Sequence, residues 1–256
     1  MTAPLFLADP LPAAPSFTLA GPEGRHAATV RRLRAGERVD VTDGRGTLVA
    51  CAVTSVGRDQ LELAVERRTV IPEPAPRLVV VQALAKGERG ELAVELLSEV
   101  GVDEIVPWAA SRSIVRWDGD RGRRSLERWR STAREAAKQS RRVWWPVIAD
   151  LAGTRDVCAR LAAAADPVVL HEEATGPLLP VARPAPTTAR GGTVVLVVGP
   201  EGGIAPDELA AFLASGARAA VVGPTVLRTS TAGAVAAALV LAASGRWTTA
   251  EPAAPI

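Results

Sequence analysis

The chain has 256 residues, 48% of them hydrophobic, which is enough for two domains with separate cores. No run approaches the roughly 18 to 20 apolar residues that a membrane span needs, and the amino-terminal sequence lacks the layout of a signal peptide. We therefore expect a cytoplasmic protein with no membrane partner. Cys51, Cys158, His26 and His171 show no metal-ligand spacing, so neither a metal site nor a disulfide framework is predicted.

The net charge of +2 hides an uneven distribution along the chain. Between Arg112 and Arg142 there are eleven Lys and Arg residues against four Asp and Glu. This clustering is typical of a phosphate-binding surface. The alternative is a solvated helix encoded by a GC-rich genome, since Lys86 and Lys138 are the only lysines. That bias accounts for the choice of arginine over lysine but not for the clustering, so nucleic-acid binding is the favoured interpretation.

Residues 1–71 are predicted to form a small β-barrel. Short apolar runs alternate with turn signals, and the Asp-Gly-Arg-Gly sequence at 43–46 is typical of a hairpin loop. One helix with several basic residues is expected around Gly24–Leu33. The expected strands are Ser16–Leu19, Arg38–Thr42, Thr47–Val56 and Gln60–Val65.

The alternating prolines of Ile71–Pro76 favour a stiff connector and mark the boundary with a second domain, 72–248. There apolar strands alternate with helices, which is typical of an α/β domain with a parallel sheet. The expected strands are Arg77–Leu84, Asp103–Trp108, Val143–Ala149, Pro167–His171, Thr193–Val198 and Ala217–Val222. The expected helices are Glu88–Val100, Ser125–Gln139, Thr154–Ala164, Pro206–Ser215 and Thr229–Ala243. An exposed loop is expected over 176–192 and a disordered tail over 249–256.

Two of these strands run directly into Gly-Pro turns. Val194–Val198 has no polar alternation, which indicates a strand covered on both faces. It is followed by Gly-Pro-Glu-Gly-Gly at 199–203, whose glycines permit positive φ and close approach of a ligand. The strand before Gly223-Pro224 repeats the arrangement. Either turn alone would fit an ordinary strand-to-helix connection, but two in one domain favour a binding site.

A third strand ends in Leu170-His171-Glu172-Glu173. Because parallel strands bring their carboxyl ends to one edge, the three turns are expected to converge on one pocket. None contains G-x-G-x-x-G followed by an acid, nor G-x-x-x-x-G-K-[ST], so the markers of dinucleotide and Walker-type phosphate binding are absent. Glycine backbone and apolar strand ends suit a ligand with an adenine and little phosphate, such as S-adenosylmethionine.

Four motifs together give a resemblance that spans nearly the whole chain. They are GPEGG at 199–203, GPTVLRTSTAG at 223–233, EAAKQSRR at 135–142 before Trp-Pro, and RHAATVRRLRAGERVDVTDGRG at 25–46. In this combination the chain resembles the ribosomal RNA small subunit methyltransferase E family of the SPOUT superfamily. The resemblance implies a PUA-like barrel, a SPOUT domain with a C-terminal trefoil knot, and a homodimer. It also implies S-adenosylmethionine bound in the knot and methylation of N3 of one uridine in 16S rRNA, uridine 1498, in naked RNA or the small subunit.

The resemblance also implies which residues hold the cofactor. They belong to the three turns and the start of the last helix. The set comprises Leu170, His171, Glu172, Val198, Gly199, Pro200, Gly202, Gly203, Val222, Gly223, Leu227, Thr229, Ser230 and Thr231.

Methylation at uracil N3 requires loss of a proton and stabilisation of the resulting anion. Arg228 is expected to stabilise that charge, because its guanidinium is permanently charged and offers several donors in one plane. Glu172 or Glu201 is expected to accept the proton. As alternatives, Arg228 binds strand-end carbonyls as a structural cation and Glu201 fixes its own turn.

Two basic clusters are expected to contact RNA, one on each domain. The first comprises Arg25, His26, Arg31, Arg32 and Arg34, and the second Lys86, Arg112, Arg134, Gln139, Arg141 and Arg142. Trp144 and Trp145 either stack on bases or pack in a core or dimer contact, and packing is expected for at least one of them.

One departure from the family pattern concerns the start of the last helix. Many relatives have Leu-Arg-x-Glu-Thr where this chain has Leu227–Thr231, so Ser230 replaces a carboxylate. If the carboxylate of the relatives is the general base, this enzyme is impaired. If the carboxylate only caps the last helix, a serine serves equally well, and we expect Ser230 to be such a cap. Two alternative functions remain: another SPOUT activity, such as ribose methylation of transfer RNA, and a non-catalytic RNA-binding module.

Overall fold

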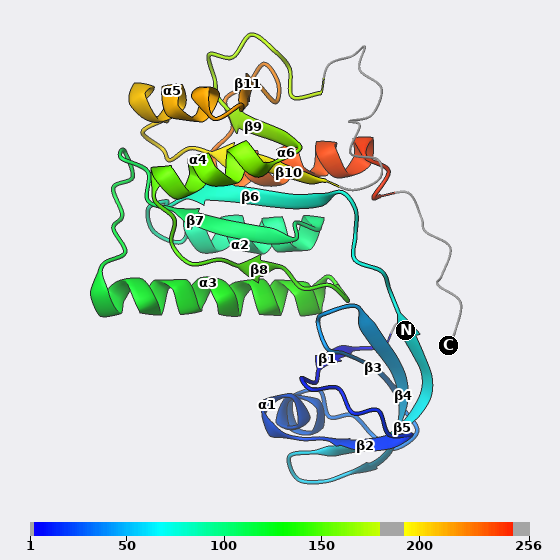
Figure 1. The fold of residues 1–256 in the computed structure, drawn as a ribbon. Helices are drawn as coiled ribbons and strands as arrows, with labels where there is room; N and C mark the ends of the chain where they lie inside the picture. Colours follow the sequence, from blue (N-terminus) through cyan, green and yellow to red (C-terminus); the bar gives the residue numbers. More distant parts are fainter. Residues whose placement is uncertain (1–2, 180–191, 248–256) are drawn as a thin grey trace. The chain divides into compact units, whose positions relative to one another are not determined.

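The computed structural model describes residues 3–179 and 192–247, which divide into two compact units (Figure 1). The first unit comprises residues up to Glu73 together with Arg141–Trp145, and the second comprises Pro74–Ser140 and the described residues from Pro146 onward. The inclusion of Arg141–Trp145 in the first unit was not anticipated from sequence. The tail expected over 249–256, and most of the loop expected over 176–192, lie outside the described residues.

The first unit contains a five-stranded sheet in the order β1-β3-β4-β5-β2. Its strands are β1 Leu5–Leu7, β2 Ser16–Leu19, β3 Arg38–Thr42, β4 Thr47–Val56 and β5 Leu61–Val70. Apolar residues at every second position, such as Val39 and Val41 in β3, face a buried core. The predicted strand Gln60–Val65 was too short at its carboxyl end. The expected helix begins earlier, as α1 Gly21–Arg25, and continues as a π-helical turn, His26–Val30.

The segment Val143–Trp145 pairs with the hairpin loop of the first unit and is not part of a strand in the second. The Trp144 indole Nε1 donates to Ile71 O at 2.9 Å, and the Trp145 backbone N donates to Gly44 O at 3.0 Å. Both indoles are half-buried, so both are used in packing. The strand expected over Val143–Ala149 was therefore wrong except at β8, Val147–Ile148.

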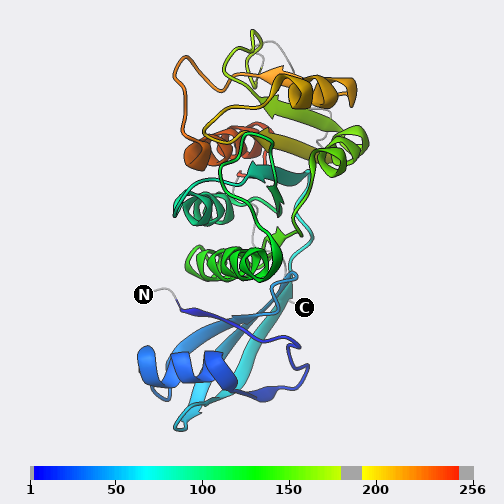
Figure 2. The same ribbon diagram turned by 90° about the vertical axis from the view of Figure 1, so that its left-hand side faces the viewer.

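The second unit is a six-stranded sheet whose strands are all parallel, in the order β11-β9-β10-β6-β7-β8. Helices cover both of its faces, as predicted (Figure 2). The remaining strands are β6 Arg77–Ala83, β7 Glu104–Trp108, β9 Asp166–Leu170, β10 Thr193–Val198 and β11 Arg218–Ala220. The helices are α2 Arg89–Val100, α3 Gly119–Gln139, α4 Thr154–Ala163, α5 Pro206–Ala214 and α6 Thr229–Ala243.

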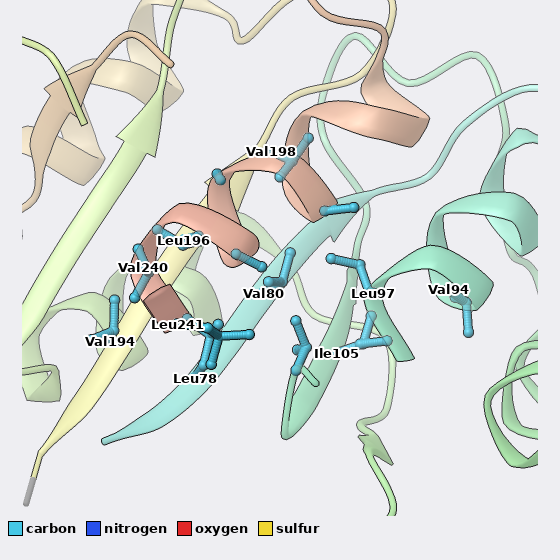
Figure 3. Close-up of a cluster of buried hydrophobic side chains, with 14 of the residues drawn as sticks. Leu78, Val80, Val94, Leu97, Ile105, Val194, Leu196, Val198, Val240 and Leu241 are labelled. Atoms are coloured by element: carbon cyan, nitrogen blue, oxygen red, sulfur yellow. The ribbon is translucent and has the colours of Figure 1, made fainter. Parts of the chain in front are cut away.

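The core of this unit lies in two layers, one on each face of the sheet. On one face Val80 and Leu196 pack with Leu97 of α2 and Leu241 of α6 (Figure 3). On the other face the alternate residues of the same strands pack against α4 and α5, with Phe212 fully buried. Burying one such side chain contributes roughly 1.5–3 kcal/mol. Two-sided burial explains why the strands show no polar alternation.

Two helices differ from expectation in detail. Helix α2 begins at Arg89, one residue after the expected Glu88, and Gly101 follows it with φ 108°, a conformation that often ends helices; its Leu92 is 42% exposed. Helix α3 begins at Gly119, whereas the sequence predicted a start at Ser125. The sequence did not predict the first turns because Gly119 and Gly122 have low helix propensity. Gly122 is required there, since a Cβ would lie 2.6 Å from the carbonyl carbon of Trp117.

No helix in the described parts of the chain is both long and apolar enough to span a membrane. The trefoil knot that the resemblance implies stays a prediction, because residues 180–191, between β9 and β10, lie outside the described residues.

Candidate functional site: a cavity at the carboxyl ends of the strands

A cavity of about 450 Å³ lies at the carboxyl ends of β9, β10 and β11. These strands are neighbours, because β9 pairs with both β10 and β11 in parallel register. The three turns singled out in the sequence all line this cavity, which confirms their convergence. A binding-site position at the strand ends of an α/β sheet follows from the shared direction of the strands.

The first turn, Gly199–Gly203, depends on its glycines. Gly203 has φ +73° and its N donates to Pro200 O at 2.9 Å, closing the turn. A Cβ on Gly199 would lie 2.8 Å from the Ile204 side chain, so no larger residue fits there without movement. The turn therefore brings bare backbone to the cavity wall.

The second turn leads from β11 into α6 and is joined to the first by a hydroxyl. The buried Thr229 Oγ1 donates to Gly199 O at 2.6 Å. Arg228 occupies the N-cap position of α6, with φ −66° and ψ 151°, and its side chain lines the cavity. Within the described residues its guanidinium has no hydrogen bond or ion pair, so the interpretation of Arg228 as a structural cation is not supported.

The expected capping role of Ser230 is wrong. The N-cap residue of α6 is Arg228, with no side-chain cap hydrogen bond. Ser230 lies buried inside the first turn, whereas Thr231 Oγ1 donates to Arg228 O at 3.2 Å. A Ser230 cap requires the helix to begin at Thr231, whereas α6 begins two residues earlier, at Thr229; neither Ser230 nor Thr231 is among the residues that line the cavity.

Glu201 is held by donors from another segment. Its Oε1 accepts from Lys86 N at 3.2 Å and from Arg89 Nη1 at 3.1 Å. Partial burial opposes ionisation, but hydrogen bonds from its own backbone N–H, Lys86 N and Arg89 outweigh it, so the pKa of Glu201 lies below its usual value. A carboxylate with a lowered pKa is a weaker base. This geometry suits a residue that fixes the turn.

This interaction predicts a pH dependence for Glu201→Gln. A lowered folded-state pKa means that the ionised carboxylate stabilises the native state fully above the ordinary pKa of 4.5 and loses this contribution as the pH falls through the folded value. We expect the variant to melt lower at pH 7 by no more than about 4 °C. The difference should persist down to about pH 5 and narrow below it. A difference that stays constant through pH 4 in parallel melting curves would contradict this.

Arg112 and Glu172 flank the glycine turn. Arg112 Nη1 donates to Gly202 O at 3.2 Å, and a Cβ on Gly202 would press on Arg112 at 3.3 Å. Glu172 is exposed and lines the cavity beside Gly203. Within the lining, Arg89 and Arg228 balance the two carboxylates in formal charge.

The structure places the expected site residues as follows. Those that line the cavity are Leu170, His171, Glu172, Val198, Gly199, Pro200, Glu201, Gly203, Val222, Gly223, Leu227, Arg228 and Thr229. Gly202, Ser230 and Thr231 are not in the lining. The lining residues outside the expected set are Arg89, Ile204, Ala220, Val221, Pro224, Thr225, Val226 and Ala232. Arg89 begins α2, after the carboxyl end of β6, and β6 is parallel to β10. Its position after a parallel strand could have indicated that it lies near the other turns.

The residues expected to bind RNA are divided between the two units. Arg25, Arg31, Arg32 and Arg34 are exposed on the first unit, whereas His26 is half-buried with its ring 6.1 Å from that of Phe6. Lys86, Arg112, Arg134 and Gln139 are exposed on the second unit. Arg141 and Arg142 were assigned to the second cluster but belong to the first unit, because Arg141–Trp145 pack with its hairpin loop.

The described residues include no group of three or more His, Cys, Asp and Glu side chains with the arrangement of a metal site. The partners of the Glu201 carboxylate are the Lys86 backbone N–H and the Arg89 guanidinium.

Comparison with known proteins defines the class first: an RNA methyltransferase domain preceded by a PUA domain. Residues 72–241 match the family model for the RNA methyltransferase domain, and residues 19–66 match that for the RNA methyltransferase PUA domain. The chain is 47% identical over 252 residues to ribosomal RNA small subunit methyltransferase E of Mycobacterium tuberculosis, covering 96% of this chain and 94% of the relative. The chain belongs to the ribosomal RNA small subunit methyltransferase E family.

Solved structures share this fold. A probable rRNA methyltransferase from Porphyromonas gingivalis is 28% identical with a TM-score of 0.76, covering 95% of this chain and 99% of the other. A ribosomal RNA small subunit methyltransferase E from Neisseria gonorrhoeae, solved bound to S-adenosyl methionine, is 24% identical with a TM-score of 0.81, covering 94% and 98%. The expected combination of a PUA-like unit and an α/β RNA methyltransferase unit with a parallel sheet is thereby confirmed.

Proposed function

We propose that this chain transfers a methyl group from S-adenosylmethionine to N3 of a uridine in 16S rRNA, and that the target is uridine 1498. The observation that carries the proposal is the cavity at the strand ends, which is lined by a glycine turn and by Arg228, whose guanidinium has no partner among the described residues. Family membership supports the RNA substrate, and the cofactor in the Neisseria gonorrhoeae structure supports the choice of methyl donor.

The residues of the cavity fit S-adenosylmethionine. Its volume of about 450 Å³ lies within the range of small-molecule sites, roughly 300–1,000 Å³. Leu170, Val198 and Leu227 offer apolar surface for an adenine, and the glycine backbone allows close approach. With formal charges balanced among Arg89, Arg228 and the two carboxylates, the cavity does not favour a polyphosphate. When bound, S-adenosylmethionine supplies an electrophilic methyl group.

The chain's own residues supply the rest of the chemistry. Arg228 stabilises the negative charge that develops on the uracil when N3 loses its proton, and its planar donors suit the carbonyl oxygens that flank N3. Glu172 holds the released proton, because it is exposed and its carboxylate, unlike that of Glu201, has no hydrogen bond to the parts of the chain that the structure describes. Glu201 keeps the glycine turn in place.

RNA is held by the exposed arginines of each unit through its phosphates, while the target base leaves its stack to enter the cavity. The arginines of the π-helical region on the first unit and those along α3 on the second provide this charge. The substrate is either naked 16S rRNA or the assembled small subunit, and both are to be assayed.

Two measurements test the proposal. Calorimetry with S-adenosylmethionine should show binding; absence of binding would favour a non-catalytic RNA-binding module. Primer extension on 16S rRNA treated with protein and cofactor should stop at a single new uridine, because N3 lies on the Watson–Crick edge. Incorporation of methyl groups without any new stop would favour ribose methylation.

We also propose that the protein is a homodimer that uses α2 and α6. These helices pack against each other, yet they expose Leu92 by 42%, Val235 by 40% and Leu239 by 36%. Val235 and Leu239 lie one helical turn apart on the same side of α6. An apolar surface of this kind is typical of a contact with a second copy.

The variant Leu239→Arg should weaken the dimer about 100-fold or more, because it places an unpaired charge in the contact. Sedimentation velocity across a concentration series measures the effect. Leu213→Arg on α5, at a leucine 43% exposed on the other face of the sheet, is the matched control and should remain dimeric. A wild-type chain that sediments as a monomer, or a Leu239→Arg dimer of unchanged affinity, would contradict the proposed contact.

A further inference from the structure

The amide of Gln82 lies buried beneath the cavity. Gln82 is fully buried near the carboxyl end of β6, beside Val198 of β10. Its Nε2 donates to Thr229 Oγ1 at 3.1 Å and is 3.4 Å from Thr229 O. A buried amide is costly unless it is hydrogen-bonded. The same Nε2 donates to Ala83 O at 3.3 Å, so the amide joins its own strand to the first residue of α6, far away in the sequence.

The other end of the same amide is its carbonyl oxygen, Oε1, which is also buried. Among the described residues, Gln82 Oε1 has no hydrogen-bond partner. An unpaired buried acceptor lowers stability, so an apolar side chain of similar length would suit this core position better. The stability of the fold therefore does not account for a glutamine here, whereas the contact with Thr229 does.

The contact continues from Thr229 into the glycine turn. A threonine hydroxyl has one proton, and Thr229 Oγ1 donates it to Gly199 O at 2.6 Å, so it accepts from Gln82. Gln82, Thr229 and Gly199 thus form one chain of hydrogen bonds that links β6, α6 and β10. Arg228, the residue before Thr229, is the N-cap of α6 and has no side-chain partner of its own among the described residues.

We infer that Gln82 is a positioning residue for Arg228. It fixes the first turn of α6 against the Gly199 turn, and this sets where the guanidinium stands at the cavity rim. The inference rests on the proposed role of Arg228 in methyl transfer. Because catalysis depends on the placement of the stabilising charge, loss of this chain of hydrogen bonds affects turnover more than substrate affinity.

The test is Gln82→Met, which keeps the length of the side chain and removes the amide. We expect kcat for methylation of 16S rRNA to fall roughly ten- to hundredfold, with KM for RNA and the melting temperature little changed. A purely structural role would instead lower the melting temperature and leave kcat per folded molecule intact. Hydrogen exchange of the ligand-free protein supplies a readout independent of activity, and amides in the first turn of α6 should exchange faster in the variant.

Two further variants sharpen the result. Ser98→Ala removes another buried polar group from the same layer of the core, remote from the cavity, and should leave kcat unchanged. Thr229→Val combined with Gln82→Met should cost less than the sum of the single changes, because both break one chain of hydrogen bonds.

Wild-type kcat together with wild-type exchange in Gln82→Met would overturn the inference, as would full additivity with Thr229→Val. If the wild-type protein itself transfers no methyl group, the proposed function fails, and the exchange measurement still decides whether Gln82 holds α6.

Discussion

Replacing Arg228 with alanine is expected to lower kcat about 10²–10³-fold, the usual cost of removing one donor that stabilises transition-state charge. Arg228 lines the cavity, and its guanidinium has no partner among the described residues, so its loss should leave α6 intact. The dissociation constant for S-adenosylmethionine should therefore change little. Single-turnover methylation and calorimetry measure the two quantities separately.

Two control variants accompany this result. Arg228→Lys keeps the charge but not the planar set of donors, so partial activity is expected. Arg155→Ala removes an exposed arginine from α4, away from the cavity, and should retain full activity. Undiminished turnover in Arg228→Ala would remove Arg228 from the mechanism, and equal losses in both alanine variants would indicate a general effect of charge on RNA binding.

The second large effect is expected at Gly24 in the first unit. A Cβ at this position would overlap the carbonyl oxygen of Leu19 and lie 2.8 Å from that of Asp59. Both obstacles are backbone atoms, so relief requires α1 to move away from the sheet. Gly24→Ala should destabilise the first unit by about 3 kcal/mol, at the upper end of the cost of overpacking.

The loss of stability in Gly24→Ala should be confined to the first unit, because the second unit has its own core and contains every residue that lines the cavity. We expect RNA affinity to fall while S-adenosylmethionine still binds. Gly36→Ala is the matched control: its Cβ would meet nothing within 4 Å, and only its φ of +88° is unfavourable, which costs about 1–2 kcal/mol. Equal stability and RNA affinity in Gly24→Ala and the wild type would show that α1 tolerates the displacement.

The parts of the site that sequence predicted are those specified by local pattern. The bounds of β10 and α6 match the predicted Thr193–Val198 and Thr229–Ala243, because an unbroken apolar run and an alanine-rich segment show where each begins and ends. The convergence of three turns followed from the parallel order of the strands. No knowledge of side-chain contacts was needed for either conclusion.

The parts that sequence did not predict depend on contacts between distant segments. Nothing near Gln82 indicates that its amide reaches Thr229, 147 positions away. Trp144 and Trp145 resemble a strand locally, yet they pack against the hairpin loop about 100 positions earlier. The Ser230 cap failed although the start of α6 was predicted correctly, because a helix that begins at Thr229 has Arg228 at its N-cap and places Ser230 inside the first turn.

The most direct test of the account is mass analysis of nucleosides from 16S rRNA and from assembled small subunits, each incubated with the protein and S-adenosylmethionine. We predict 3-methyluridine at one position per RNA molecule, and its loss with Arg228→Ala. A ribose-methylated nucleoside, or no methylated nucleoside in either substrate despite cofactor binding, would contradict the proposal that this cavity methylates uracil N3.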